Sequence, residues 1–338
     1  MADDARRGAL FAAKLTALAR PHLDGHEPTK LDFPGGAALV AGPAAWLLLD
    51  NAPVGSLGPA LVWAERRGAT DVHLVTDRDA GILARRAALF ESAPTVWSVA
   101  GTDLVRATPD PVSVAAPAEP AADLAALMVD ADLEVLVEDG LVRGEVLGLE
   151  VARIVHGTST SGIPLDEPLL EVGVGQADRE MTGMLHGAMR PVDQLARVSQ
   201  IVRDLRRPDA ERHPLNQLVP ERWLRSLLVA DPGRIGLAAL RPVPAAVPRA
   251  NLRERGIAVA AGEDLAGAPV VVACSVGVDL DLVPAAADTR LSVDADAELL
   301  LVVPGRDAHP VTVALAARLV HPARVVPVDD DWRTFGRQ

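Results

Sequence analysis

The fold of this chain is decided by residues 71–99, which read DVHLVTDRDAGILARRAALFESAPTVWSV. A similar stretch, LLLVVPGRDAHPVTVALAARLVHPARVVP, occupies residues 299–327 and aligns with the first without a gap. Each stretch contains a β-branched and leucine-rich run, the tripeptide Arg-Asp-Ala, an alanine-rich segment and a second apolar run. Apolar runs on either side of a helical segment are typical of a strand–helix–strand unit in a parallel sheet. The sequence therefore predicts an α/β fold with an internal repeat.

The regions around the two stretches extend the same pattern. We predict two related parallel α/β parts, each ordered strand-helix-strand-helix-strand, that flank a central region with an antiparallel hairpin and helices. The hairpin is expected at Asp139-Gly140, because this turn dipeptide lies between two runs of alternating apolar and polar residues. Proline-rich stretches at 108–123 and 241–256 are the expected linkers. The predicted parts are an N-terminal part over 1–115, a central region over 116–240 and a C-terminal part over 250–338.

The repeated tripeptide has two interpretations, because it lies where a strand ends and a helix begins. Asp79 and Asp307 can cap the helices that follow, with their carboxylates accepting backbone N–H groups. Alternatively, Arg78-Asp79 and Arg306-Asp307 bind a ligand, since ligands of open α/β sheets bind beyond the carboxyl ends of the strands. Residues 275–279, which follow another apolar run, belong to the same edge. We expect the caps.

Composition excludes several classes of function. The net charge of −13 disfavours nucleic acid as a partner, and no stretch approaches the roughly 20 apolar residues of a membrane span. The two lysines, Lys14 and Lys30, do not follow a glycine-rich turn, so no P-loop is expected. One cysteine, Cys274, cannot form an intramolecular disulfide. The charged amphipathic start lacks a secretory signal, and the protein is therefore expected in the cytoplasm.

The run LLEVGVGQADRE, residues 169–180, is the most suggestive of chemistry. An apolar strand that ends at Glu171 and is followed by Gly173-x-Gly175 resembles the first motif of class I S-adenosylmethionine methyltransferases. The resemblance covers only a few residues, and Ala177 stands where the family has a third glycine. It implies a methyltransferase that binds S-adenosylmethionine on this loop.

The same region also resembles the core of PD-(D/E)xK nucleases, in which a helix, a hairpin and a further strand carry the acidic residues. The resemblance implies that Glu145, Glu150 and Glu171 hold a divalent cation, and Asp178 is a further candidate. The cofactor would be Mg²⁺ or Mn²⁺. Gly173 stands at the position of the family's lysine, so a nuclease-like fold without the chemistry is an alternative. Asp178 and Glu180 could also form an acid–base or metal cluster with His186.

The function that these observations favour is a non-catalytic binding or regulatory protein with a protein or a small molecule as its partner. This hypothesis depends on the missing lysines and the absence of a nucleophile motif from the sequence. The alternatives are a divalent-metal-dependent carboxylate hydrolase, related to the nuclease resemblance, and the methyltransferase.

Overall fold

The computed structural model describes residues 2–50, 53–112, 118–119, 121–184, 190–210, 213–248 and 255–335, excepting the side chains of 2–5, 177 and 181–184. The described chain forms two compact units. The N-terminal unit consists of Met1–Val112 together with Leu280–Asp288 and His309–Arg324. The second unit consists of Ser113–Asp279, Thr289–Ala308 and Val325–Gln338. Each unit is therefore built from segments that are far apart in the sequence.

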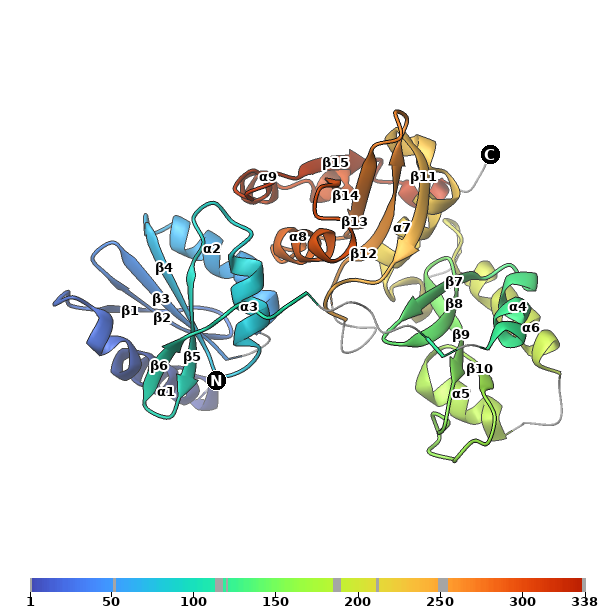
Figure 1. Ribbon diagram of the computed structural model, residues 1–338, viewed down its shortest axis with the longest axis horizontal. Helices are drawn as coiled ribbons and strands as arrows, with labels where there is room; N and C mark the ends of the chain where they lie inside the picture. Colours follow the sequence, from blue (N-terminus) through green and yellow to red (C-terminus); the bar gives the residue numbers. More distant parts are fainter. Residues whose placement is uncertain are drawn as a thin grey trace. The chain divides into compact units, whose positions relative to one another are not determined.

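The N-terminal unit contains a six-stranded sheet whose strands follow their sequence order (Figure 1). Its centre is parallel, because β3 pairs with β4 and β4 pairs with β5 in parallel register. The outer pairs are antiparallel. The predicted strand at 71–76 is confirmed. The strands are β1 (Thr29–Leu31), β2 (Gly36–Ala41), β3 (Ala44–Leu49), β4 (Asp71–Thr76), β5 (Thr95–Ala100) and β6 (Asp103–Arg106).

Helix α1 (Ala2–Ala19) packs its apolar side on one face of this sheet. Its Leu15 and Leu18 contribute to the same buried cluster as Leu39 and Trp46 of the sheet. Figure 1 shows α2 (Leu57–Glu65) on the other side of the strands from α1. The unit also contains α3 (Ala80–Ala87), the first part of α8 (Leu282–Val293) and α9 (Pro310–Ala317). The composition predicts a core of this kind, in which a sheet of apolar strands is covered by helices on both faces.

Two adjacent arginines of α3 bind a segment that is distant in the sequence but belongs to the same unit. Arg85 and Arg86 are 6% and 3% exposed, and both donate to the carboxylate of Asp288, which is completely buried. The Arg85 Nε and Asp288 Oδ1 atoms are 2.7 Å apart. Arg86 also donates to Asp281, at 3.1 Å. The first part of α8 is therefore bound to the N-terminal unit by buried ion pairs.

A histidine lies among aromatic rings on the sheet of this unit. His73 stacks on Trp46, with ring centroids 3.9 Å apart, and its Nδ1 accepts a hydrogen bond from Trp97 Nε1 at 3.2 Å. Because Nδ1 is an acceptor, the proton of the neutral ring lies on Nε2 and is donated to Asp71, 2.9 Å away. Burial lowers the pKa of His73 below 6.5, although Asp71 opposes the shift. The folded unit therefore favours neutral His73.

We expect the N-terminal unit to lose stability as the pH falls below about 6.5. The unfolded chain binds the proton at the ordinary pKa of histidine, whereas the folded chain resists it until a lower pH. The stabilisation is therefore complete above that value and is lost towards the folded pKa. Urea unfolding midpoints measured across this pH range should fall, and the fall should be smaller in His73→Phe, which keeps the stacking. Equal slopes for the two proteins would contradict this role of His73.

The second unit contains a four-stranded antiparallel sheet in the order β10-β9-β8-β7. The predicted hairpin is confirmed: Asp139 and Gly140 join β7 to β8 with φ values of 54° and 72°. Helices α4 (Ala122–Asp130) and α6 (Pro191–Leu205) cover its apolar face. The strands are β7 (Glu134–Glu138), β8 (Leu141–Val146), β9 (Leu149–Val155) and β10 (Leu169–Val172), and α5 (Gly175–Met184) follows them.

The second unit also contains a five-stranded sheet in the order β11-β12-β13-β14-β15. The β13 and β14 strands are parallel, whereas β11 and β12 add an antiparallel extension. The β11 strand overlaps the predicted linker at 241–256, since its pairing with β12 outweighs its prolines. The α/β fold class is confirmed. The strands are β11 (Leu237–Val243), β12 (Ala258–Asp264), β13 (Pro269–Cys274), β14 (Glu298–Pro304) and β15 (Arg324–Val328).

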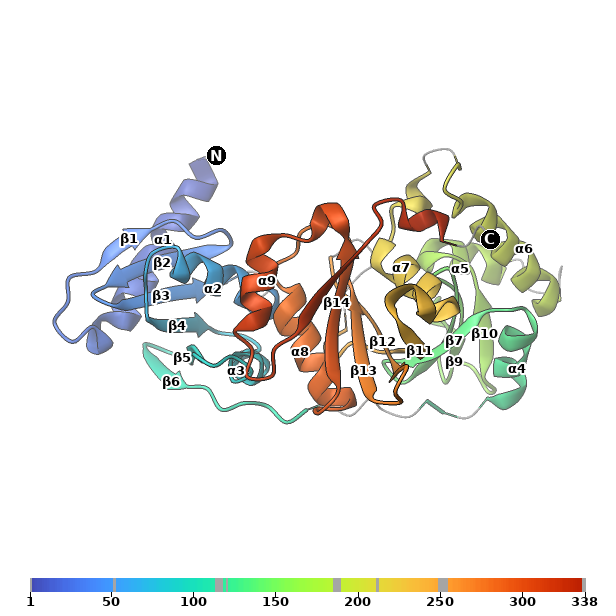
Figure 2. The ribbon, with the colours of Figure 1, turned by 90° about the horizontal axis from the view of Figure 1, so that it is seen from above.

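Helix α7 (Pro220–Ala230) lies between the two sheets of the second unit (Figures 1 and 2). Its Trp223, Leu224 and Leu228 join the buried cluster of the β11–β15 sheet. Arg222 and Arg225 reach in another direction, to glutamates of β7 and β8. The helix therefore has one apolar side and one cationic side, and each side contacts a different sheet.

The two repeated stretches have the same element order, β4–α3–β5 and β14–α9–β15. Their duplication stays a prediction, but the expected caps are wrong. Asp79 adopts a left-handed φ of 53°, and its side chain makes no capping hydrogen bond. Helix α9 is capped by His309, whose Nδ1 accepts the N–H of Val311, because a 3₁₀ turn (Gly305–Asp307) displaces the helix start beyond Asp307.

Short 3₁₀ helices complete the described structure: η1 (Arg20–His22), η2 (Pro53–Ser56), η3 (Pro214–Asn216), η4 (Pro232–Ile235), η5 (Gly305–Asp307) and η6 (Trp332–Thr334). None of the helices in the described ranges is long and apolar enough to span a membrane.

Candidate functional site

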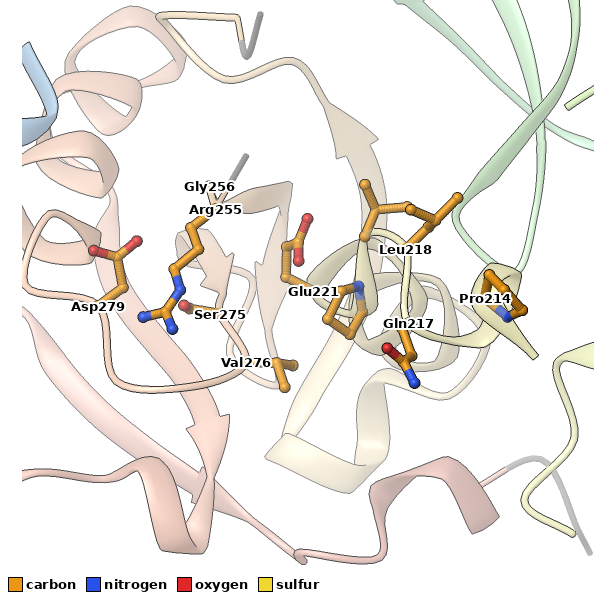
Figure 3. Close-up of a pocket in the computed structure, with 11 residues that line it drawn as sticks. Pro214, Gln217, Leu218, Glu221, Arg255, Gly256, Ser275, Val276 and Asp279 are labelled. Atoms are coloured by element: carbon orange, nitrogen blue, oxygen red, sulfur yellow. The ribbon is translucent and has the colours of Figure 1, made fainter. Parts of the chain in front are cut away.

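The second unit contains a cavity of about 410 Å³ between the end of β13 and the start of α7. Its volume lies within the range of small-molecule sites, about 300–1,000 Å³. Figure 3 shows side chains from three segments around it. The lining residues are Pro214, Gln217, Leu218, Val219, Pro220, Glu221, Arg255, Gly256, Ser275, Val276 and Asp279.

The loop after β13 forms one wall of the cavity. Ser275 is 2% exposed, and its N–H donates to Val302 O of β14, so the loop begins at the carboxyl ends of two parallel strands. Gly277 has a φ of 88°, which favours glycine, and its N–H donates to Asp307 Oδ2 at 2.7 Å. Asp307 therefore fixes the loop that lines the cavity. This is the sheet edge at which ligands of α/β proteins bind.

The start of α7 forms another wall. Pro220 occupies the first turn, where the missing N–H of proline costs nothing. Glu221 follows in that turn and is 4% exposed, and its negative charge is favourable at the positive end of the helix dipole. The helix start thus places a buried carboxylate at the cavity.

The lining carries charges of both signs. Arg255 donates from Nη1 to Val278 O at 3.0 Å, which holds its side chain along the loop. Figure 3 shows its guanidinium group beside Ser275 and Asp279. Glu221 and Asp279 supply carboxylates, whereas Leu218 and Val276 supply apolar surface. The cavity can therefore bind a molecule with both charged and apolar parts.

A buried arginine supports the cavity wall formed by residues 214–219. Arg206 is 2% exposed and donates to three backbone carbonyls, those of Leu147 (2.6 Å), Leu215 (3.3 Å) and Leu218. Its Nε has no hydrogen-bond partner within the described structure. Burial lowers the pKa of Arg206 to about 10, against the attraction of Glu145 and Glu221. Arg206 is thus a charged group that neutral carbonyls hold in place.

The predicted catalytic residue Glu145 lies in a row of carboxylates on the charged face of the β7–β10 sheet. Its register partners are Glu134 on β7 and Glu150 on β9. Arg222 and Arg225 of α7 each donate to one oxygen of Glu145, which is 1% exposed. Each carboxylate oxygen of Glu145 therefore accepts a hydrogen bond from a guanidinium group.

The charged face shifts the pKa values of two neighbouring carboxylates in opposite directions. Burial would raise the pKa of Glu145, but Arg225 and Arg222 outweigh it and hold that pKa below its ordinary value. Burial raises the pKa of Glu134, and the repulsion from Glu145 adds to the shift, although Arg225 and a hydrogen bond from Ser226 oppose it. The arginines thus stabilise the charged form of the central carboxylate in the row.

The other three acidic candidates have local partners of their own. Glu150 accepts hydrogen bonds from Arg143 (2.9 Å), Arg153 (2.7 Å) and Arg179 (2.9 Å). Glu171 accepts from the N–H of Thr160 at 2.6 Å and from its hydroxyl group. Asp178 accepts the N–H of Val174 at 2.7 Å. Residue 186 lies outside the described residues. Within the described ranges, no group of three or more His, Cys, Asp or Glu side chains is placed to hold a metal ion.

The strand–glycine–helix geometry that suggested a methyltransferase loop is present. The β10 strand leads through Gly173 (φ 146°) and Gly175 (φ 80°) into α5. However, β10 is an edge strand whose neighbour β9 is antiparallel to it, whereas the resemblance implies a doubly wound parallel sheet.

The residues of the repeated tripeptide separate into different roles. Arg78 donates to Asp50 O, and Asp79 has no capping bond. The Arg306 N–H donates to Asp330 at 2.8 Å, and Asp307 holds the cavity loop. Of the predicted ligand-binding residues, Asp307 is the one with a direct link to the cavity.

Apart from the segment 275–279, none of the lining residues was predicted, and two of those missed, Glu221 and Arg255, are charged. The tripeptide Val219-Pro220-Glu221 has the composition of a helix start with an acid in its first turn, which could have indicated Glu221. Arg255 lies within the predicted linker, and no local pattern indicates it. Cys274 precedes the loop but is buried, which raises its thiol pKa to about 12 and disfavours the reactive thiolate.

No known protein family, curated protein or solved structure matches this chain.

Proposed function

We propose that this chain is a cytoplasmic, non-catalytic binding protein whose ligand is a small zwitterionic molecule of the amino-acid class. The observation that carries the proposal is the cavity at the carboxyl end of β13, which is lined by Arg255, Glu221 and Asp279. A regulatory protein that senses such a molecule needs a pocket of this size with both apolar and charged lining.

The lining matches the two ends of an amino acid. The guanidinium group of Arg255 is suited to a carboxylate, because its planar donors can form paired hydrogen bonds. The carboxylates of Glu221 and Asp279 offer acceptor oxygens for an amino group, and a carboxylate can accept several hydrogen bonds at once. Leu218 and Val276 provide apolar contact for a side chain.

Phosphate-containing ligands fit the same wall less well. Backbone N–H groups in a loop beyond a strand are the donors that usually bind phosphate. Here the Gly277 N–H already donates to the Asp307 carboxylate. Glu221 and Asp279 add negative charge at the cavity, and the chain carries a net charge of −13. These observations favour a ligand without a phosphate group.

The surroundings of the acidic residues favour binding over catalysis. A general base or metal ligand must offer an oxygen to water, substrate or a cation. Glu145 and Glu150 instead accept hydrogen bonds from five different arginines between them. Ion pairs of this kind stabilise a structure and leave little capacity for a reaction.

The proposal predicts that at least one free L-amino acid raises the melting temperature of the full chain. At a ligand concentration of about 100 times the dissociation constant, binding contributes about 2.7 kcal/mol. We expect the shift to be abolished in Arg255→Gln, which removes the cation for the carboxylate. Thermal melting in the presence of each of the twenty amino acids would measure this shift in melting temperature. Inorganic phosphate and putrescine are tested in the same way as the other two probes.

The matched control is Arg241→Gln, which removes an exposed arginine of β11 in the same unit and outside the cavity. It should keep the full shift. The proposal fails if none of the amino acids shifts the melting temperature, or if Arg255→Gln retains the shift.

A further inference from the structure

Residues 214–219 form a short segment between α6 and α7 that we name the lip. Four of its residues, Pro214, Gln217, Leu218 and Val219, line the cavity. The lip begins with η3, where the Leu215 N–H donates to His213 Nδ1 at 3.3 Å, and it ends at the start of α7. Its own regular structure is limited to this single 3₁₀ turn. A change in its backbone would therefore change the opening of the cavity.

The last residue of the lip has an unfavourable backbone conformation. Val219 has φ 42° and ψ 53°, in the left-handed region that β-branched residues rarely adopt. It also precedes Pro220, and the ring of a proline favours an extended conformation for the residue before it. Two independent steric effects thus act on one buried residue. Extended backbone at Val219 would relieve both effects and would turn the lip away from α7.

Hydrogen bonds from the buried Arg206 side chain hold the lip in this strained conformation. Arg206 donates to the carbonyls of Leu215 and Leu218 at both ends of the lip, and to Leu147 O in the turn between β8 and β9. The α7 backbone also holds Val219, because the Arg222 N–H donates to its carbonyl at 3.0 Å. Hydrogen bonds from a guanidinium group to neutral carbonyls are weaker than bidentate pairs with a carboxylate. The restraint on the lip is therefore weaker than a bidentate ion pair would provide.

The lip and the loop after β13 line the same cavity. Ser275 of that loop is only 2% exposed. A ligand that contacts the Ser275 side chain therefore needs the lining around it to move, and the lip is one wall of that lining.

We infer that the lip is a gate for the cavity, which Arg206 holds closed against the backbone strain at Val219. Opening relaxes Val219 to an extended conformation and exposes Ser275, and closing restores the three Arg206 hydrogen bonds. The use of the gate rests on the proposed function, but its opening is a property of the chain alone and is measured without a ligand.

The experiment uses Ser275→Cys as a reporter, since a thiol at this position reacts with iodoacetamide only when the lip opens. The native Cys274 is buried and has a raised pKa, and the wild-type chain measures its background labelling. Each variant is made in the Ser275→Cys chain and is checked for folding by circular dichroism.

The first comparison is between Val219→Gly and Val219→Ala. Both variants remove the valine methyl groups from the core, but only glycine adopts the left-handed conformation without strain. We expect the reporter to react about tenfold more slowly in Val219→Gly than in Val219→Ala, because relief of the strain favours the closed lip. Equal rates would overturn the gate.

The second comparison is between Arg206→Lys and Arg203→Lys. Both keep a cation on α6, but a lysine at 206 cannot reach three carbonyls, whereas Arg203 is a partly exposed residue that bonds Asp132. We expect labelling about tenfold faster in Arg206→Lys and unchanged in Arg203→Lys. An unchanged rate in Arg206→Lys would also overturn the gate, and if that variant does not fold, the glycine–alanine comparison decides alone.

Addition of amino acids separates this inference from the proposed function. If the variants change the labelling rate as expected but no amino acid binds, the gate holds and the proposed ligand class is wrong. If an amino acid binds but the variants leave the labelling rate unchanged, the ligand class holds and the gate is wrong.

Discussion

Asp288→Ala is expected to destabilise the N-terminal unit by about 3–5 kcal/mol, because it leaves two buried guanidinium groups without their shared carboxylate. Arg85 and Arg86 both donate to Asp288, and the three side chains are at most 7% exposed. Arg86 keeps its contact with Asp281, but Arg85 is left with backbone carbonyls near Pro111. Most of the loss is the cost of keeping a buried positive charge without compensation.

Urea unfolding followed by circular dichroism measures this loss as a lower midpoint for the N-terminal unit. The control is Glu65→Ala, which removes an exposed ion pair with Arg318 in the same unit and should cost less than about 1 kcal/mol. If Asp288→Ala costs no more than this control, the two arginines are not held by Asp288 in the way described.

Glu145→Ala is expected to destabilise the second unit by about 3–5 kcal/mol for a related reason. The carboxylate lies between Arg222 and Arg225, and all three side chains are at most 8% exposed. Glu138 still pairs with Arg222, and Glu134 still pairs with Arg225. Each arginine nevertheless loses one of its two carboxylate partners at a largely buried site.

Chemical unfolding of Glu145→Ala should be compared with that of Asp231→Ala, which removes an exposed carboxylate beside Arg234 in the same unit. The control should cost less than about 1 kcal/mol. The amino-acid binding test should still succeed in folded Glu145→Ala, since Glu145 does not line the cavity. A fully stable Glu145→Ala chain would contradict the structural role of the charged face.

The elements that could be predicted from the sequence are those whose signal is local. The strand at 298–304 contains a continuous apolar run, which a parallel strand buried on both faces requires, and the strand at 71–76 contains Val72, Leu74 and Val75. The turn at Asp139-Gly140 needs positive φ at both residues, and this dipeptide adopts it readily. These signals were sufficient for the α/β class and for the central hairpin.

The features that the sequence did not predict depend on partners far along the chain. The acidic residues of the central hairpin were visible, but the arginines that neutralise Glu145 lie 77 and 80 residues later. Asp307 has the composition of a helix cap, yet its carboxylate bonds Gly277, 30 residues earlier. An aspartate that caps a helix and an aspartate that accepts a hydrogen bond from a distant loop are the same residue in the sequence. The local pattern therefore does not distinguish these two roles.

The binding of Asp288 to α3 has a consequence for the order in which this protein is made. The residues up to Val112 leave the ribosome well before the carboxylate that neutralises Arg85 and Arg86, which lies 203 and 202 residues later in the sequence. At a synthesis rate of about 5–20 residues per second, the intervening chain takes roughly 10 to 35 seconds to make. During this interval the nascent N-terminal unit contains two arginines without their partner. Its folding therefore finishes only after Asp288 has been synthesised, and by then most of the second unit, Ser113–Asp279, has been made.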